Sequence, residues 1–515
     1  MKGGNLKNMK IAIVHDFLMQ MGGAEKVVEV LHDMFPDAPI YTSVYDAKAM
    51  PDEYRNWDIR TSFLQKMLLK KKLHRMALLL YPAAFESFDL SEYDVVISSS
   101  SAFAKGIITQ PHTTHICYTH APMRYAWMTD SYVKKEKISG PLRSLLTPGL
   151  HYLRTWDSIA ANRVDKYIAN SSAVSQRIEK FYRRECDVVY PPVETERFQI
   201  AENVGDYYIL VSRFVPYKRI DLAVEAFTRL GRPLKIVGTG RQMKSLKESA
   251  GPNVEFLGHV KDAELNKLVA EARGFIMPGE EDFGIAAVEA NASGRPVIAY
   301  AAGGSLDVQV DGVTGVLFRE QTAEALCDAV LRADQIEWNP QMIRTRAIKR
   351  FDTQVFRDRM TQVIAETLTA KTRTAPPRMD DRRMGDRRLN DRRMVEQDSP
   401  YPDDRRQAPR RNDERRTGDR RAGGRRGLDS ASTSTVSAST STVEIYNDAT
   451  KGKPVVAHKA VVAHNAMQNG NGASAQNGNH NGNGHHGNGS NGNGANHEAL
   501  EHIIADMKAR ESATR

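Results

Sequence analysis

Short apolar runs alternate with amphipathic stretches along residues 10–368. Residues 10–14 are almost continuously apolar, as expected for a buried strand of a parallel sheet. Gly22 and Gly23 follow, and apolar residues then recur at helical spacing: Val27, Val30, Leu31 and Met34. Further strand-like runs occupy residues 94–98, 114–118, 166–169 and 188–189. The alternation predicts an α/β fold with a doubly wound parallel sheet.

A second series of strand-like runs follows a polar break with two prolines near residues 191–206. It consists of residues 207–213, 234–238, 254–258, 274–277 and 296–300. We therefore expect two Rossmann-like domains, over residues 1–200 and 201–349, and a further helix over residues 350–370. A binding crevice is expected where the carboxyl ends of the two sets of strands face each other.

The chain changes character after residue 370. Arg-Arg pairs recur every five residues from Arg382 to Arg393 and from Arg405 to Arg426, followed by Ser/Thr-rich and Asn/Gly/His-rich segments. Apolar residues are scarce there, so little burial could offset the entropy of ordering the backbone. We expect a disordered tail over residues 371–496 and a short amphipathic helix over residues 497–515.

The charge of the chain is concentrated in this tail. The net charge is +9, and residues 371–427 alone carry 19 Lys and Arg against 11 Asp and Glu. The basic balance therefore says little about the partners of the two domains. The three cysteines have no paired spacing and no secretory signal is visible, which together predict a cytoplasmic protein.

Two glutamates, Glu281 and Glu289, dominate the candidate chemistry. They lie eight positions apart in the segment PGEEDFGIAAVEANASGRPVIA, in which Phe283, Gly284 and Ile285 are expected to open a helix. A helix N-terminus offers unpaired amides to an anion. Eight residues span about two helical turns, so both carboxylates are expected on one side of the crevice. This arrangement suits a nucleotide-sugar.

Other candidate residues follow predicted strands. Arg213 and Lys218 come directly after the strand ending near Val211, where fixed cations can stabilise the charge of a leaving diphosphate. Gly22, Gly23 and Gly238 would let the backbone approach phosphates. No Asp-x-Asp stands in a suitable context, so we expect neither a metal site nor a bound cofactor.

Several motifs in the same order resemble the retaining glycosyltransferases of family 4. They are the Glu-x7-Glu segment, SRFVPYKRIDLAVEAF from Ser212, AAGGSLDVQVDGVTGVLF from Ala301, and KIAIVHDFLMQMGGAEKVVEVL from Lys10. The resemblance implies the GT-B fold, in which two Rossmann-like domains face a crevice. It also implies retention of anomeric configuration, independence of metal, and a front-face mechanism without a covalent intermediate.

The resemblance also assigns roles to residues. Glu289 would hold the ribose, Glu281 would lie by the donor sugar, and His120 in YTHAPMRYAW would lie beside the sugar and the reacting phosphate. Arg124 and Trp127 are expected to contact the acceptor. Asp307 stands where many relatives have a glutamate, and the sequence assigns it no role.

The segments over residues 14–31 and 118–127 look most like bacterial polysaccharide mannosyltransferases. This likeness implies transfer of a hexose, with mannose from GDP-mannose as the best candidate, to a polyprenyl-linked or polysaccharide acceptor in cell-surface glycan synthesis. Residues 63–80 carry an apolar face beside five basic residues: Lys66, Lys70, Lys71, Lys72 and Arg75. We expect this stretch to contact the anionic inner face of the cell membrane.

Two alternatives stay open. A sugar-nucleotide epimerase has the same fold but would lack the pairing of Arg213 and Lys218 with the Glu-x7-Glu segment. The Arg-Arg repeats could instead bind nucleic acid, although interleaved aspartates and the absence of regularly spaced aromatic residues argue against that function.

Overall fold

The computed structural model describes residues 9–68, 78–128 and 140–374. Two parallel sheets lie in one compact unit of this part of the chain. The predicted α/β fold with two Rossmann-like domains is confirmed. The predicted tail beyond residue 374, the predicted helix over residues 497–515 and Lys70–Arg75 of the predicted membrane contact lie outside the described residues.

The first sheet has seven parallel strands in the order β3-β2-β1-β4-β5-β6-β7. They are β1 (Ile11–His15), β2 (Ile40–Thr42), β3 (Ile59–Thr61), β4 (Val95–Ser100), β5 (Thr114–Thr119), β6 (Lys166–Ala169) and β7 (Cys186–Val188). Every residue of β1, β4 and β5 is buried, including the polar residues Ser98, Ser99 and Ser100 of β4, because these strands lie near the centre of the sheet. The sequence did not predict β2 and β3, because three residues are too few to show a period.

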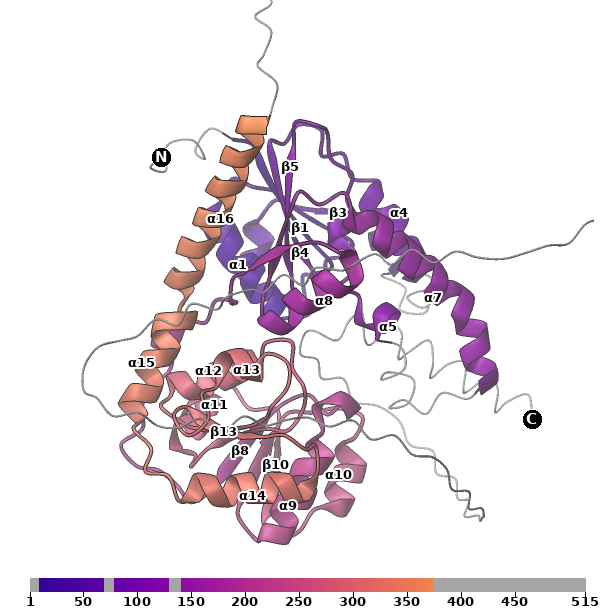
Figure 1. The fold of residues 1–515 in the computed structure, drawn as a ribbon. Coiled ribbons are helices and arrows are strands. Elements are labelled where there is room, and N and C mark those ends of the chain that lie inside the picture. Colours follow the sequence, from indigo (N-terminus) through magenta and orange to yellow (C-terminus); the bar gives the residue numbers. More distant parts are fainter. Residues whose placement is uncertain (1–8, 69–77, 129–139, 375–515) are drawn as a thin grey trace, which may run out of the picture. The chain divides into compact units, whose positions relative to one another are not determined.

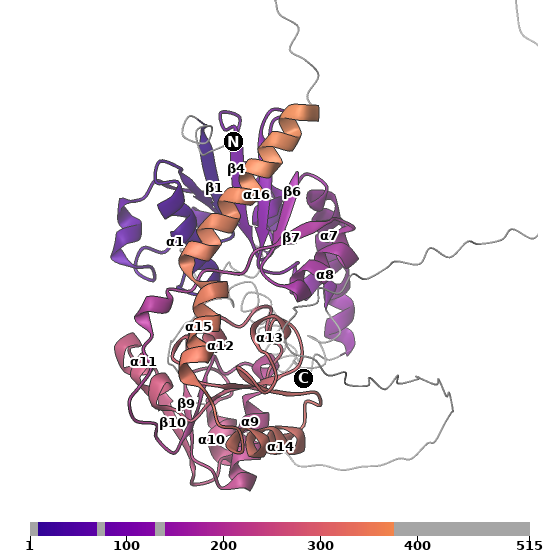
Figure 2. The same cartoon turned by 60° about the vertical axis from the view of Figure 1, so that its left-hand side comes forward.

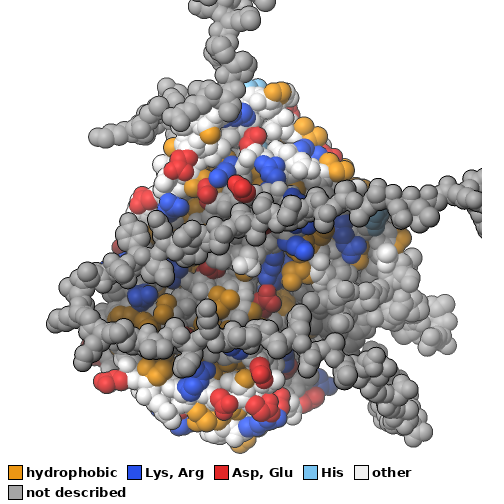
Figure 3. All heavy atoms as spheres, viewed as in Figure 1, with side chains coloured by type: hydrophobic (Ala, Val, Ile, Leu, Met, Phe, Trp, Pro, Cys, Tyr) orange, Lys and Arg blue, Asp and Glu red, His pale blue; other side chains and the backbone are white. Residues whose placement is uncertain are grey.

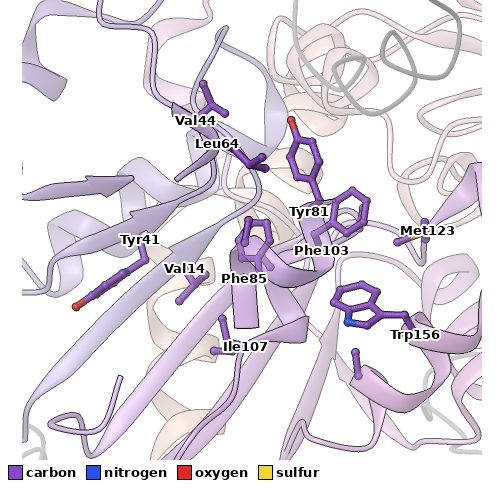
Figure 4. Packing of buried hydrophobic residues seen from close by; sticks show 14 of the residues in the cluster. Val14, Tyr41, Val44, Leu64, Tyr81, Phe85, Phe103, Ile107, Met123 and Trp156 are labelled. Atoms are coloured by element: carbon purple, nitrogen blue, oxygen red, sulfur yellow. The ribbon is translucent and has the colours of Figure 1, made fainter. Parts of the chain in front are cut away.

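The main helices of the first domain are α1 (Gly23–Met34), α2 (Leu64–Leu68), α4 (Tyr81–Glu86), α5 (Arg124–Trp127), α7 (Gly140–Ala161) and α8 (Ser172–Tyr182). An aromatic cluster fixes α4 and α7 to the sheet. The ring of Phe103 stacks on Tyr81 at 4.9 Å and lies 5.7 Å from Trp156 between ring centroids. Figure 4 shows these rings beside Phe85 and Met123. The cluster holds the loop after β4, which borders the crevice described below.

The second sheet has six parallel strands in the order β10-β9-β8-β11-β12-β13. They are β8 (Tyr208–Val211), β9 (Leu234–Val237), β10 (Val254–Gly258), β11 (Phe275–Met277), β12 (Val297–Tyr300) and β13 (Gly315–Phe318). The glycine-rich sequence from Ala301 hid β13 in the prediction. The helices of this domain are α9 (Ile220–Leu230), α10 (Met243–Ser249), α11 (Asp262–Glu271), α12 (Ile285–Ala292), α13 (Ser305–Val308), α14 (Ala323–Asp334) and α15 (Pro340–Phe351).

The strand order reverses once in each sheet, and both reversals locate the chemistry. In the first sheet β1 lies between β2 and β4, and in the second sheet β8 lies between β9 and β11. Successive connections leave such a point in opposite directions, which opens a crevice at the carboxyl ends of the two central strands. The residues that follow β1, β4, β8 and β11 are therefore the ones positioned to contact a ligand.

The last helix, α16 (Thr353–Thr374), packs against the first domain although it follows the second in sequence. Its buried side chains join those of β1, α1 and β4 in one apolar cluster: Phe356, Met360, Val363 and Ile364. Figure 1 shows α16 beside α1, and Figure 2 shows it running across the first sheet. The chain thus crosses between the domains twice, which limits how far they can separate.

Charged side chains of both signs are interspersed on the coloured part of the face seen in Figure 3. This agrees with the sequence, in which residues 371–427 carry most of the net positive charge and the two domains are nearly neutral. Among the helices of residues 9–374 that are described, none has both the length and the apolar character needed to cross a bilayer.

We predict that Phe356→Ala lowers the free energy of unfolding by about 3–5 kcal/mol, because it opens a cavity where α16 meets the first sheet. Arg359→Ala, on the exposed side of the same helix, is the matched control and should change it by less than about 0.5 kcal/mol. Urea unfolding followed by circular dichroism measures both. Equal stability of the two variants would contradict the packing of α16 described above.

Candidate active site

A cavity of about 680 Å³ lies at the carboxyl ends of both sheets, with walls from both domains. Its volume is in the range of pockets that enclose a small organic ligand. Ten residues expected in the site line it: Gly23, His120, Arg124, Arg213, Lys218, Gly238, Glu281, Phe283, Gly284 and Ile285. The structure therefore brings together residues that are up to 262 positions apart in the chain.

Lys218 and Glu281 form an ion pair on the wall contributed by the second domain. Lys218 ends a short 3-10 turn after β8, and Glu281 follows β11, the neighbouring strand. Gly279 makes this approach possible, because a Cβ at that position would lie 2.8 Å from the Cα of Lys218. Burial opposes the positive charge, but the attraction of Glu281 outweighs it and raises the pKa of Lys218. Lys218 is thus a cation at neutral pH.

Two arginines extend the positive charge around the cavity. Arg213 follows β8 and lies near the hydroxyl of Tyr217, at 3.4 Å from Nη2. Arg124, on α5 of the first domain, pairs with Asp282 at 3.0 Å. Burial opposes the charge of Arg124, but the carboxylate of Asp282 outweighs this effect, and the pKa of Arg124 is raised. An anion entering the cavity would therefore meet cations from both domains.

The N-terminus of α12 faces the same cavity. Gly284 precedes the helix with φ of +94°, a conformation that favours glycine, and Ile285 and Ala286 line the cavity. Amides in the first turn of a helix have no acceptor one turn earlier, so they are available to a bound anion. Gly303 and Gly304 pack directly against Glu281 and Phe283, since a Cβ on either glycine would clash with their backbone.

Glu281 and Glu289 are not on one helix, so the predicted spacing of two helical turns between them is wrong. The helix begins only at Ile285, so Glu281 belongs to the preceding loop and does not lie two helical turns from Glu289. Glu289 is outside the residues that line the cavity, and its carboxylate lies 3.5 Å from Nζ of Lys26 on α1. Gly22 also lies outside the lining, where it caps α1.

His120 is fixed by three hydrogen bonds at the end of β5. Its N–H donates to the carbonyl of Ser100 at 2.8 Å, and its carbonyl accepts from Nδ2 of Asn170 at 3.0 Å. Its Nε2 lies 2.7 Å from Oγ of Ser99. Burial, and next the positive charge of His15, lower the pKa of His120 to about 3, so the imidazole is neutral at physiological pH.

Trp127 is not brought to the cavity as an acceptor contact. Its indole stacks on Phe181 at 5.0 Å between centroids, and its Nε1–H donates to Asp157 at 2.6 Å. Asp307 gains a structural role that the sequence did not reveal. Its carboxylate accepts hydrogen bonds from the backbone N–H, at 2.9 Å, and the hydroxyl of Ser172. A side chain of the second domain therefore caps the beginning of α8 in the first.

Sequence reasoning also missed polar groups that join the two walls. Arg177 on α8 binds Glu280 at 2.7 Å and also Asp282. The two acidic residues that Arg177 binds are distant from it in sequence, and a single charged residue on a helix is usually solvated. The sequence did contain a signal for other polar residues near the site, namely their position at the ends of buried strands. His15 ends β1, and Ser99 and Ser100 end β4.

Comparisons with known proteins agree with this geometry. The Glycosyltransferase Family 4 model matches residues 21–197, and the Glycosyl transferases group 1 model matches residues 192–350. The chain therefore belongs to the GT-B glycosyltransferases. It is 24% identical over 332 residues to an uncharacterized glycosyltransferase of Methanocaldococcus jannaschii, covering 63% of this chain and 88% of that protein.

Two further relatives are enzymes with assigned names. The alpha-1,3/1,6-mannosyltransferase of Schizosaccharomyces pombe is 23% identical over 423 residues, covering 67% of this chain and 80% of the relative. The glycogen synthase of Pseudomonas aeruginosa is 33% identical over 170 residues, which cover 31% of this chain and only 33% of that enzyme.

Solved structures share the fold. Anabaena HepE in complex with UDP and glucose aligns with a TM-score of 0.53 and 18% identity, covering 69% of this chain and 99% of HepE. Sucrose-phosphate synthase from Thermosynechococcus elongatus aligns with a TM-score of 0.56 and 17% identity, covering 70% of this chain and all of that one.

We predict that Lys218→Ala and Arg213→Ala each lower the rate of glycosyl transfer by about 100-fold or more, because each removes a fixed cation from the anion site. Lys244→Ala is the matched control, since that lysine lies on α10 with 91% of its side chain exposed. Single-turnover rates with thermal unfolding as a folding check measure the effect. Near-normal rates in both cavity variants would contradict the assignment.

Proposed function

We propose that the chain is a retaining, metal-independent hexosyltransferase that takes its sugar from a nucleotide-sugar. The observation that carries the proposal is the convergence of Arg213, Lys218 and the N-terminus of α12 on one cavity, with His120 on the facing wall. Fixed cations and amides can stabilise the negative charge that grows on a leaving diphosphate. The same elements leave room opposite them for a hexose.

The proposed reaction is a front-face displacement at the anomeric carbon. The bond from that carbon to the diphosphate oxygen breaks, and the acceptor oxygen forms a bond on the same face. The acceptor proton passes to the leaving phosphate oxygen, so atoms and charge balance. The ion pair with Lys218 supports this route, because it engages the carboxylate of Glu281 and makes it a poor nucleophile for a covalent intermediate.

The donor is proposed to be GDP-mannose, and the acceptor a polyprenyl-linked or polysaccharide glycan of the cell surface. The S. pombe relative, named as a mannosyltransferase, supports mannose. HepE, solved with UDP-glucose, keeps UDP-glucose as the competing donor. We place the reaction on the cytoplasmic side of the membrane, where nucleotide-sugars are made and a lipid-linked acceptor can be reached without a spanning segment.

The exposed apolar residues at the ends of the predicted membrane contact support such an acceptor. Phe63 and Leu79 each expose 45% of their surface and flank the segment that is not described, whereas Leu64 and Leu78 anchor its two ends in the core. Apolar side chains held at the surface in this way can enter the interfacial region of a bilayer.

A donor screen tests the proposed function. We predict turnover of GDP-mannose in the presence of a polyprenyl-linked acceptor, no loss of rate on adding EDTA, and a product with the anomeric configuration of the donor by proton NMR. Lys218→Ala is the inactive control. Release of GDP with inversion would contradict the retaining mechanism, and an epimerised nucleotide-sugar formed without acceptor would instead identify an epimerase.

A further inference from the structure

His120 is linked to a buried pair of ionisable side chains behind the cavity wall. His15 ends β1 and Glu25 lies in the first turn of α1, and both side chains are 2% exposed. Nε2 of His15 lies 3.5 Å from Oε1 of Glu25, which is an ion-pair distance and not an aligned hydrogen bond. The proposed function gives neither residue a role.

The surroundings of His15 indicate that its ring carries two protons. Nδ1 lies 3.1 Å from the carbonyl oxygen of Ser99, which can only accept a hydrogen bond. Nε2 faces the carboxylate of Glu25, which also only accepts when it is ionised. Both ring nitrogens therefore face acceptors, as an imidazolium requires. A buried carboxylate without a counter-charge would be strongly unfavourable, so each charge stabilises the other.

The hydroxyl of Ser99 connects the doubly protonated ring of His15 to the ring of His120. Its Oγ lies 3.1 Å from Nδ1 of His15 and 2.7 Å from Nε2 of His120. Because Nδ1 of His15 already carries a proton, it can only donate toward Ser99. The Ser99 hydroxyl hydrogen is then free to point at Nε2 of His120. A ring nitrogen that accepts a hydrogen bond is unprotonated, so the single proton of a neutral His120 lies on Nδ1.

The other ionisable groups near His15, Ser99 and His120 form their hydrogen bonds with other partners. The carboxylate of Asp16 accepts four backbone N–H groups, from residues 101–104. The hydroxyl of Tyr118, whose ring lies 5.2 Å from that of His120, donates to the carbonyl of Val189 at 2.9 Å. Among the described residues, none forms a hydrogen bond with Nδ1 of His120. Since His120 lines the cavity, Nδ1 is the ring atom open to a ligand.

We propose that His15 and Ser99 are positioning residues that hold His120 as a neutral imidazole with its proton on Nδ1, aimed at a hydroxyl of the transferred sugar, and that Glu25 balances the charge of His15. This role rests on the proposed function. Positive charge develops on the sugar ring in the transition state of glycosyl transfer. A neutral donor can hold a sugar hydroxyl without adding a second positive charge beside that ring. Neutral histidines with lowered pKa serve as hydrogen-bond donors in other active sites.

Nitrogen NMR of the full chain with ¹⁵N-labelled histidine rings tests the assignment without any sugar present. Resonances are assigned by their loss in His15→Gln and His120→Gln. We expect both nitrogens of His15 to be protonated, and only Nδ1 of His120. In Glu25→Gln we expect His15 to lose the proton on Nε2, because that nitrogen no longer faces a carboxylate. Nδ1 of His15 still faces the carbonyl of Ser99, so it should keep its proton, and His120 should keep its own proton on Nδ1. A proton on Nε2 of His120 in the unaltered chain, or no change in the ring of His15 in Glu25→Gln, would overturn the proposal.

Transfer rates then test the consequence, with a control on the adjacent residue. Ser99→Ala should lower kcat about tenfold with little change in KM for the donor, the cost of losing one hydrogen bond. Ser98→Ala removes a similar bond, from Ser98 Oγ to Nε2 of buried His115 at 2.8 Å, but on the opposite side of the strand and away from the cavity. It should leave kcat unchanged.

The two proposals fail in different ways. Equal kcat in Ser99→Ala and Ser98→Ala, with both variants folded, would overturn the positioning role. A chain that transfers no sugar but shows the expected ring protonation would overturn the proposed function and support the assignment of the tautomer. Ser99→Ala could lower the unfolding temperature more than Ser98→Ala. In that case Ser99→Thr is the second variant, because it keeps the hydroxyl and should restore the proton on Nδ1 of His120. A folded Ser99→Thr variant without that proton would contradict the assignment.

Discussion

The ion pair between Lys218 and Glu281 ties together the two loops that leave the reversal point of the second sheet. One loop follows β8 and the other follows β11, and the absence of a side chain at Gly279 lets them touch. Asp282, the next residue, carries the interaction across the crevice to Arg124 and Arg177. The positions of both walls of the cavity therefore depend on charges that follow one another along a single loop.

These charges also explain why the site combines stability with access for a ligand. A buried cation or anion without a partner is costly, and Lys218 and Arg124 at the cavity are each held against an opposite charge. The pair between Lys26 and Glu289 spans the two domains at 3.5 Å, a distance that indicates a weak contact. We infer that such contacts stabilise the walls and can be exchanged for contacts with a ligand of similar polarity.

The sequence predicted the strands and helices that show a local pattern of apolar residues. The buried run at β1 and the helical spacing in α1 were sufficient for the first unit of the sheet, and the same signals located β8 to β12. Strands β2 and β3 were missed because each has three residues, and β13 because glycines surround it. In the site, residues next to strand ends were found, such as Arg213 and Lys218. The helical spacing of Glu281 and Glu289 misled, since Gly284 starts the helix only afterwards.

Contacts between distant segments could not be predicted in this way. His15, Glu25 and Ser99 belong to three elements that meet only when the sheet forms, and Asp307 reaches Ser172 across 135 positions. Trp127 was assigned to the acceptor because it lies near His120 in sequence, but α5 turns its indole toward Phe181. Sequence proximity thus identified the loop and not the direction of its side chains.

The central claim is that both domains build one site for the donor. Hydrogen exchange with and without a nucleoside diphosphate measures this most directly, because it reports each wall separately. The account predicts slower exchange on binding GDP in residues 212–218 and 279–287 of the second domain and also in residues 120–125 of the first. Protection confined to the second domain, or protection elsewhere in the chain, would contradict a site shared by both.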